Sequence, residues 1–256
     1  MGRRFASVGL VAVVALGAAP PASAHVAPSF DVNNRYLKLS PLGDRIRLAY
    51  TVVYGDLPGA AARRSLDTSG DGQLSDEEGD AFGRALAAEV APALTVTVDG
   101  APLPVTWAEV HVGLGTPTTA AGAFSVDLIA WLCLPAGDRH TLVLRDRHAL
   151  PSPGETGVRI EDGTGIRVEA ARLGAEALPT LDASWQGAGG PLADPGLTIA
   201  FAVLPAAPRP HDGMCGAAAT AAAPPRLWRW ALPAVFVAMV GATAVFVRRY
   251  YRKMNG

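Results

Sequence analysis

The stretch that decides the fold is RIRLAYTVVY, residues Arg45–Tyr54. Every second side chain in it is apolar, namely Ile46, Leu48, Tyr50, Val52 and Tyr54. A period of two is typical of a β-strand that buries one face and exposes the other. We therefore predict a strand here, with these five side chains in the core of a β domain.

Runs of the same kind follow along the chain. LTVTV (Leu94–Val98) precedes Asp99-Gly100, a dipeptide typical of a two-residue hairpin turn, and Phe124–Leu134 is apolar enough for a central strand. Further strands are predicted in HTLVLRD (140–146), in GVRIEDGTGIRVEAA (157–171) as a strand pair turning at Asp162-Gly163, and in GLTIAFAVL (196–204). Short strands separated by turn signals indicate a mainly β, antiparallel β-sandwich-like domain over residues 25–204.

One segment, residues 59–91, departs from this pattern and is predicted to be a helix-loop-helix insertion. Phe82, Leu86 and Val90 recur at a spacing of four, which is one stripe of a helix. A second helical run, GAAARRSL, precedes Asp67. Between the two runs lies DTSGDGQLSDEE, residues Asp67–Glu78.

This loop matches the calcium loop of an EF-hand. Such a loop supplies oxygen ligands at positions 1, 3, 5, 7, 9 and 12, with a glycine at position 6 for a sharp turn. The corresponding residues here are Asp67, Ser69, Asp71, Gln73 through its backbone carbonyl, Ser75 directly or through water, and Glu78 as a bidentate ligand, with Gly72 at position 6. Ser69 departs from the usual Asp or Asn. The alternative is a solvated turn whose acids cap the next helix.

The sequence contains no second loop of this kind, although EF-hands usually work in pairs. Exported calcium modules bind with dissociation constants of about 10⁻⁴–10⁻³ M. We therefore expect a weak site that holds Ca²⁺ as a structural ion rather than as a signal.

Both ends of the chain indicate export and anchoring. Residues 1–24 combine a basic start, a short apolar run and a small-x-small end, as in a secretory signal peptide, and an uncleaved anchor is the alternative. Residues 205–225 are a Pro/Ala-rich tether, 226–248 a predicted transmembrane helix and 249–256 a basic cytoplasmic tail. The expected product is a single-pass protein of the cell membrane with its N-terminal domain outside the cytoplasm.

The exported part is acidic. Without Arg3, Arg4 and the six basic residues between Arg226 and Lys253, 14 of the 22 basic residues remain against 23 acidic ones, which is a net charge of −9. Phosphate binding needs a basic face, so nucleic acid is not expected as a partner. Divalent cations suit such a charge.

The two cysteines, Cys133 and Cys215, lie outside the predicted membrane segment, where a disulfide can form, but their spacing leaves open whether they pair or stay reduced. Of the five histidines, none has a metal-ligand spacing to another. Cleavage after Ala24 would leave His25 with a free amine and an imidazole, a pair that chelates Ni²⁺ or Cu²⁺; the alternative is a flexible terminus without a role. GxSxG, SxxK and HExxH motifs do not occur in the sequence, so no enzyme activity is expected.

Several features in order resemble the exported domain at the front of bacterial nickel/cobalt permease-type proteins. They are His25, then Asn34-Arg35-Tyr36, then Asp56-Leu57-Pro58, and then the Asp-rich loop. Those permeases continue into several spans, whereas one is expected here. The resemblance therefore implies an accessory protein for transition-metal uptake that uses His25, with a membrane permease or another protein as its partner; the oligomeric state is left open.

Overall fold

Strand β2 (Arg45–Tyr54) coincides with the predicted strand and lies inside the first of two six-stranded sheets. Its five alternating apolar side chains are all buried, which confirms the period-two prediction. The structure, a computed structural model, describes residues 31–161, 163, 165–205, 207 and 215. The predicted signal peptide, most of the tether, the membrane span and the basic tail lie outside these residues.

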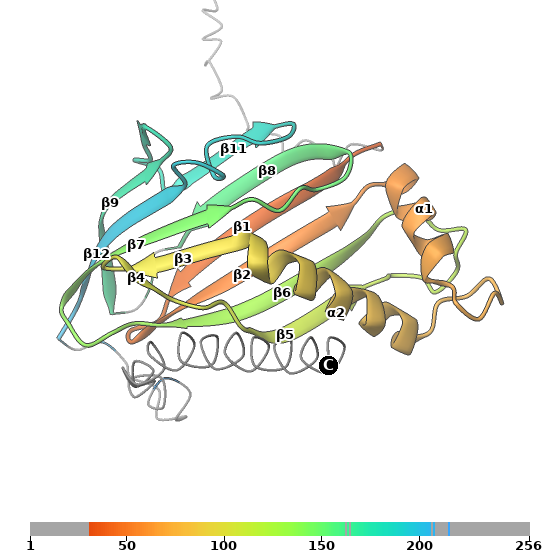
Figure 1. Ribbon diagram of the computed structural model, residues 1–256, viewed down its shortest axis with the longest axis horizontal. Helices are drawn as coiled ribbons and strands as arrows, with labels where there is room; N and C mark the ends of the chain where they lie inside the picture. The colour runs from red at the N-terminus through yellow and green to blue at the C-terminus, as the bar shows by residue number, and fades with distance from the viewer. Residues whose placement is uncertain (1–30, 162, 164, 206, 208–214, 216–256) are drawn as a thin grey trace, which may run out of the picture.

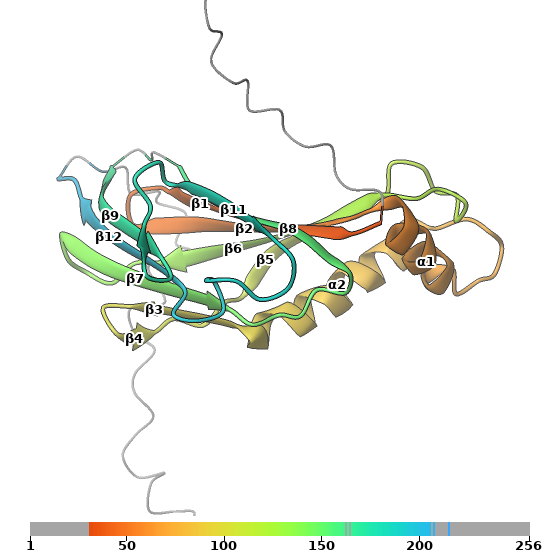
Figure 2. The same cartoon turned by 90° about the horizontal axis from the view of Figure 1, so that it is seen from above.

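The two sheets lie face to face and enclose one apolar core (Figures 1 and 2). The first sheet has the order β11 (Asp182–Gln186), β8 (Pro153–Ile160), β1 (Asn33–Pro41), β2, β6 (Phe124–Cys133) and β5 (Trp107–Gly113). The second has the order β10 (Glu176–Ala177), β9 (Ile166–Leu173), β12 (Leu197–Val203), β7 (Arg139–Asp146), β3 (Leu94–Val98) and β4 (Ala101–Pro102). This arrangement confirms a mainly β, sandwich-like domain.

Several local predictions are confirmed. Strands β3 and β4 pair as a hairpin whose turn residues Asp99 and Gly100 have φ angles of 53° and 79°. Positive φ at both central residues is what a tight hairpin turn requires. The apolar run at Phe124 forms β6, which lies between β2 and β5 and is therefore internal to its sheet.

Two predictions about strand pairing are wrong. The segment 157–171 does not form a strand pair, because β8 joins the first sheet while β9 joins the second. The sheets are also not purely antiparallel, because β1 and β8 run parallel, with Leu37 opposite Val158. More than a hundred residues separate β1 from β8, so no tight turn imposes an antiparallel direction on them.

The helix-loop-helix insertion is present between β2 and β3. Helix α1 (Asp56–Leu66) and helix α2 (Asp76–Ala93) extend slightly beyond the predicted bounds of 59–91. The predicted stripe on α2 faces inward, with Leu86 and Val90 buried and Phe82 packed against the core. Helix α1, the loop and the β5–β6 connector (residues 114–123) lie at one end of the sandwich, and α2 runs from that end along β5 to the start of β3 (Figures 1 and 2).

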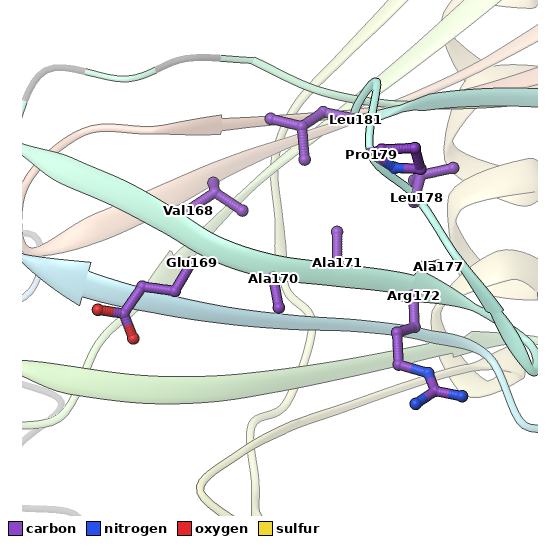
Figure 3. Close-up of a pocket in the computed structure, with 9 residues that line it drawn as sticks. All are labelled: Val168, Glu169, Ala170, Ala171, Arg172, Ala177, Leu178, Pro179 and Leu181. Carbon is purple, nitrogen blue, oxygen red and sulfur yellow. The ribbon is translucent and has the colours of Figure 1, made fainter.

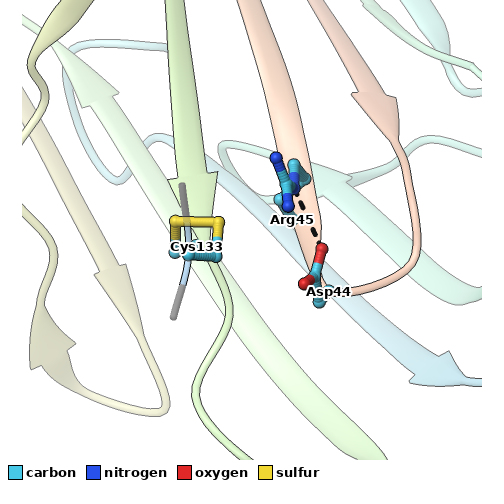
Figure 4. Close-up of a disulfide and its surroundings, with 4 residues drawn as sticks. Asp44, Arg45 and Cys133 are labelled. Atoms are coloured by element: carbon cyan, nitrogen blue, oxygen red, sulfur yellow. Dashed lines mark hydrogen bonds and ion pairs between the residues drawn. A yellow bond between two sulfur atoms is a disulfide. The ribbon is translucent and has the colours of Figure 1, made fainter. Parts of the chain in front are cut away.

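A disulfide joins Cys133 to Cys215, so the pairing that the sequence left open is present (Figure 4). It lies at the end of β6, beside the start of β2, where Arg45 pairs with Asp44 at 2.9 Å. The opposite end of β6 begins at Phe124, next to the connector. The disulfide and the connector therefore lie at opposite ends of the sandwich.

Candidate metal centre

The stretch Asp67–Glu78 begins directly after α1 and ends in the first turn of α2, as the motif requires. Its position-6 residue, Gly72, has a φ of 79°, in the left-handed region that glycine adopts without steric cost. Leu74, at position 8, is only 4% exposed and belongs to the main core. The loop is thus anchored to the domain by one apolar side chain, while its acids lie at the surface.

Asp67 organises the first half of the loop. Its Oδ1 accepts hydrogen bonds from the Ser69 hydroxyl at 3.1 Å, the Gly70 amide at 2.7 Å and the Asp71 amide at 3.2 Å, and its Oδ2 accepts one from the Gly72 amide at 2.9 Å. Desolvation raises the pKa of Asp67, but these hydrogen bonds outweigh it, so the pKa lies below its ordinary value. Asp67 is therefore ionised at neutral pH.

Glu78 closes the loop from the other side. Its Oε2 accepts from the Ser75 amide at 3.0 Å, and the Ser75 hydroxyl in turn accepts from the Glu78 amide, which completes a capping box at the start of α2. Its Oε1 accepts from the amides of Thr68 at 2.8 Å and Ser69 at 3.1 Å. These hydrogen bonds, with that of Ser75 first, lower the pKa of Glu78 to about 2.

The six predicted ligands are thus gathered in one loop. The Asp71 carboxylate accepts from the Gln73 amide at 2.8 Å, so each predicted carboxylate ligand accepts hydrogen bonds from backbone amides. Within the described part of the chain, no three His, Cys, Asp or Glu side chains are placed to hold a metal ion.

The chemistry of the donor set nevertheless fits calcium. All six donors are oxygen atoms, and carboxylates, hydroxyls and backbone carbonyls are what Ca²⁺ prefers. Bidentate ligation by Glu78 would require its Oε1 to exchange the amides of Thr68 and Ser69 for the ion. Ionised carboxylates on Asp67 and Glu78 make this exchange independent of proton release near neutral pH.

The loop has a partner that the sequence did not reveal, the β5–β6 connector. The connector forms an isolated antiparallel bridge in which Gln73 lies opposite Thr118. The Leu74 amide donates to the Pro117 carbonyl at 2.6 Å, and the Thr119 amide donates to the Gly72 carbonyl at 3.1 Å. The connector carries no ligand motif, so no sequence signal pointed to it.

Arg63 on α1 is a second residue that sequence reasoning missed. It is 0% exposed, and its guanidinium donates to carbonyl oxygens of the connector. The acceptors are the carbonyls of Thr116 at 2.7 Å, Gly122 at 3.0 Å, Ala123 at 3.2 Å, Thr118 at 3.3 Å and Leu114. The sequence does not distinguish Arg63 from its neighbour Arg64. Only the structure shows that Arg63 is buried while Arg64, in the same helix, is exposed.

The histidines do not form a common site in the described residues. His111 lies exposed on β5 with Glu109 at 3.0 Å, while His140 is buried on β7 with Asp99 at 2.7 Å. His148 is half-buried beyond the end of β7, with Tyr50 at 3.4 Å. His25, the expected transition-metal ligand, lies outside the described residues.

A buried polar cluster joins the two sheets elsewhere in the core. Arg35 on β1 forms an ion pair with Asp146 on β7 at 2.8 Å, and the Tyr50 hydroxyl on β2 donates to the same carboxylate at 3.1 Å. The side chains of Arg35 and Asp146 are 6% and 0% exposed. Burial, followed by the charge of Asp146, raises the pKa of Tyr50, so its phenol stays protonated and remains a donor. The cluster fastens one sheet to the other.

A hollow of about 420 Å³ lies along β9 (Figure 3). Leu178, Pro179 and Leu181 line one side of it, whereas the charged side chains of Glu169 and Arg172 point to the opposite side of the strand. Of the residues that line the hollow, only Glu169 and Arg172 are ionisable.

No protein-family model matches the chain, and a search of curated proteins found no match either. Among the described residues, no helix is both long and apolar enough to cross a bilayer. The predicted span at 226–248 lies outside them.

Proposed function

We propose that this protein binds one calcium ion through Asp67–Glu78, and that the ion stabilises the exported domain of a single-pass membrane protein. The observation that carries the proposal is the loop itself: a twelve-residue pattern of oxygen donors lies between two helices, with a left-handed glycine at position 6. The acidic character of the exported part supports cation binding as well.

Six residues would hold the ion. Asp67, Asp71 and Glu78 supply carboxylate oxygens, Ser69 and Ser75 supply hydroxyls, and Gln73 supplies its carbonyl. A bound Ca²⁺ would attract these oxygen atoms and draw the six residues together. Glu78 would exchange hydrogen bonds for the ion, because its Oε1 accepts from the amides of Thr68 and Ser69 in this structure.

Calorimetric titration of the full-length chain in detergent tests the proposal. We expect one site with a dissociation constant of about 10⁻⁴–10⁻³ M. At 10 mM calcium, such a site stabilises the folded state by about 1.4–2.7 kcal/mol, which raises the melting temperature by roughly 3–10 °C. Mg²⁺ should bind more weakly, because it demands a smaller octahedral shell.

Glu77 provides a matched control for Glu78. Both are acidic residues in the first turn of α2, but only Glu78 is at a ligand position. We expect Glu78→Gln to abolish the calcium-dependent rise in melting temperature and Glu77→Gln to retain it. Equal losses in the two variants would indicate general charge attraction, and no calcium effect on the parent up to 10 mM would refute the proposal.

The membrane part of the proposal rests on the sequence pattern at residues 1–24 and 226–248. Protease treatment of intact cells or spheroplasts tests it directly. The domain that contains Cys133 should be digested from outside, whereas a tag after residue 256 should be protected. Protection of the domain would refute the proposed orientation.

A further inference from the structure

Both helices of the candidate calcium site are attached to one β-hairpin, formed by β5, the connector and β6. We propose that the connector (residues 114–123) takes the place of the second EF-hand loop with which such a loop usually pairs. Arg63 is the positioning residue that couples calcium binding to the order of the connector. The inference rests on the proposed calcium site, and it names the connector as the segment to which the effect of the ion is transmitted.

The backbone bridge is the first line of support. Two hydrogen bonds flank the Gln73–Thr118 pair, one donated by Leu74 and one donated by Thr119. They lie at positions 6 to 8 of the loop, next to the position-7 carbonyl that is a predicted ligand. Any change in the loop backbone on ion binding therefore acts on the connector, where Thr119 lies 47 positions after Gly72.

Arg63 is the second line of support. Removing a guanidinium from water is costly unless its donors are satisfied, and here every hydrogen-bond acceptor described for Arg63 is a connector carbonyl. The planar fork of arginine can satisfy several carbonyls at once, which the single ammonium of lysine cannot do in the same geometry. Arg63 thus fixes the connector to α1 one turn before Asp67.

Close packing attaches the helices themselves to the hairpin. On α2, a methyl group at Gly83 would lie 2.7 Å from Val110 of β5, and the Trp107 indole donates to the Ala87 carbonyl at 2.9 Å. On α1, a methyl group at Gly59 would lie 2.6 Å from the carbonyl oxygen of Gly122 in the connector.

These contacts hold both helices against the same hairpin, which leaves little freedom for the angle between them to change. Calcium binding is therefore expected to stiffen the loop and the connector together rather than to open the helices. Such coupling is reciprocal: if the ion favours the ordered connector, an ordered connector favours the ion.

Amide hydrogen exchange on the full-length chain, with calcium and without it, tests the inference. We expect calcium to slow exchange at the amides of Thr119 and Ala123 by roughly 5-fold or more, the lower end of usual coupling. The amide of Thr141 is a matched control. It donates to the Asp99 carboxylate at 2.8 Å, just as the amide of Ala123 donates to the Asp56 carboxylate at 3.0 Å, but Thr141 lies on the second sheet. Its exchange should not change.

Arg63→Met and Arg64→Met form a matched pair of variants, since each removes one positive charge from α1. We expect Arg63→Met to weaken calcium binding roughly 10-fold, within the usual range of coupling, and to remove the effect of calcium on Thr119. Arg64→Met should stay within about twofold of the parent, because surface substitutions seldom matter. If Arg63→Met does not fold, the exchange measurement on the parent decides the question.

The outcomes separate this inference from the proposed function. Calcium binding by the parent with unchanged exchange at Thr119 and Ala123, or with equal affinities for the two methionine variants, would overturn the coupling and leave the calcium site intact. No calcium binding by the parent would overturn both.

Discussion

Asp146→Asn tests the contribution of the buried cluster to stability. The substitution removes one negative charge and leaves the guanidinium of Arg35, 6% exposed, without its ion-pair partner at 2.8 Å. Breaking a buried pair in this way costs about 3–5 kcal/mol, a large part of the roughly 5–15 kcal/mol that stabilises a typical domain. For a domain of this size the melting temperature should fall by roughly 6–20 °C.

The control is an exposed ion pair of the same type. Arg159 and Asp182 lie 3.4 Å apart with side chains 64% and 52% exposed, and such pairs contribute about 0–1 kcal/mol. In urea denaturation followed by circular dichroism, the free energy of unfolding of Asp146→Asn should therefore be lower than that of Asp182→Asn by at least about 2 kcal/mol. Adding Arg35→Met to Asp146→Asn should recover part of the loss, because it removes the unpaired charge.

Equally small losses of stability in Asp146→Asn and Asp182→Asn would refute this prediction. That result would mean that Arg35 is not effectively removed from water, or that Tyr50 and the neighbouring backbone compensate for the lost charge. A double variant less stable than Asp146→Asn itself would equally contradict the argument, since packing rather than charge would then dominate.

Three further predictions concern other parts of the domain. Serine at both Cys133 and Cys215 removes a link across 82 positions and should lower the free energy of unfolding in urea by about 2–4 kcal/mol; an unchanged midpoint would contradict this. Burial lowers the pKa of His148, so the unfolded chain binds its proton more readily and stability should fall as the pH drops below about 6.5. His148→Gln should make stability depend less steeply on pH in this range. An unaltered pH dependence would show that other groups cause it. Gly83→Ala, which places a methyl group 2.7 Å from Val110, should lower the free energy of unfolding by about 1–3 kcal/mol despite the helical preference of alanine. A more stable variant in thermal melts would show that β5 shifts to accommodate the methyl group.

Much of the fold could be predicted because its signals are local. The alternating stretch Arg45–Tyr54 specifies a strand and its buried face, and Asp99-Gly100 specifies a hairpin turn, since side-chain period and backbone φ depend on near neighbours. The pairing of residues 157–171 was predicted wrongly for the same reason. A turn signal between two strands favours a hairpin, but the strands lie in different sheets.

The candidate site divides in the same way. All six predicted ligands lie within Asp67–Glu78, so their spacing alone predicts a calcium loop, and the structure places this stretch directly after α1 and into the first turn of α2. The connector and Arg63 could not be predicted. Arg63 and Arg64 are adjacent and chemically identical, and only the packing of α1 on the hairpin decides which of them is buried.

The sequence by itself determined several of the strands, the helix-loop-helix insertion and the predicted ligand pattern of the loop, because each depends on residues a few positions apart. Only the tertiary structure decided which strands share a sheet, that Cys133 meets Cys215, that Arg35 meets Asp146, and that the unpaired loop rests on the β5–β6 connector. Contacts of this second kind join residues far apart in the chain. They form where burying apolar surface and satisfying buried polar groups can be achieved together, and that balance is a property of the whole packed domain rather than of any one segment.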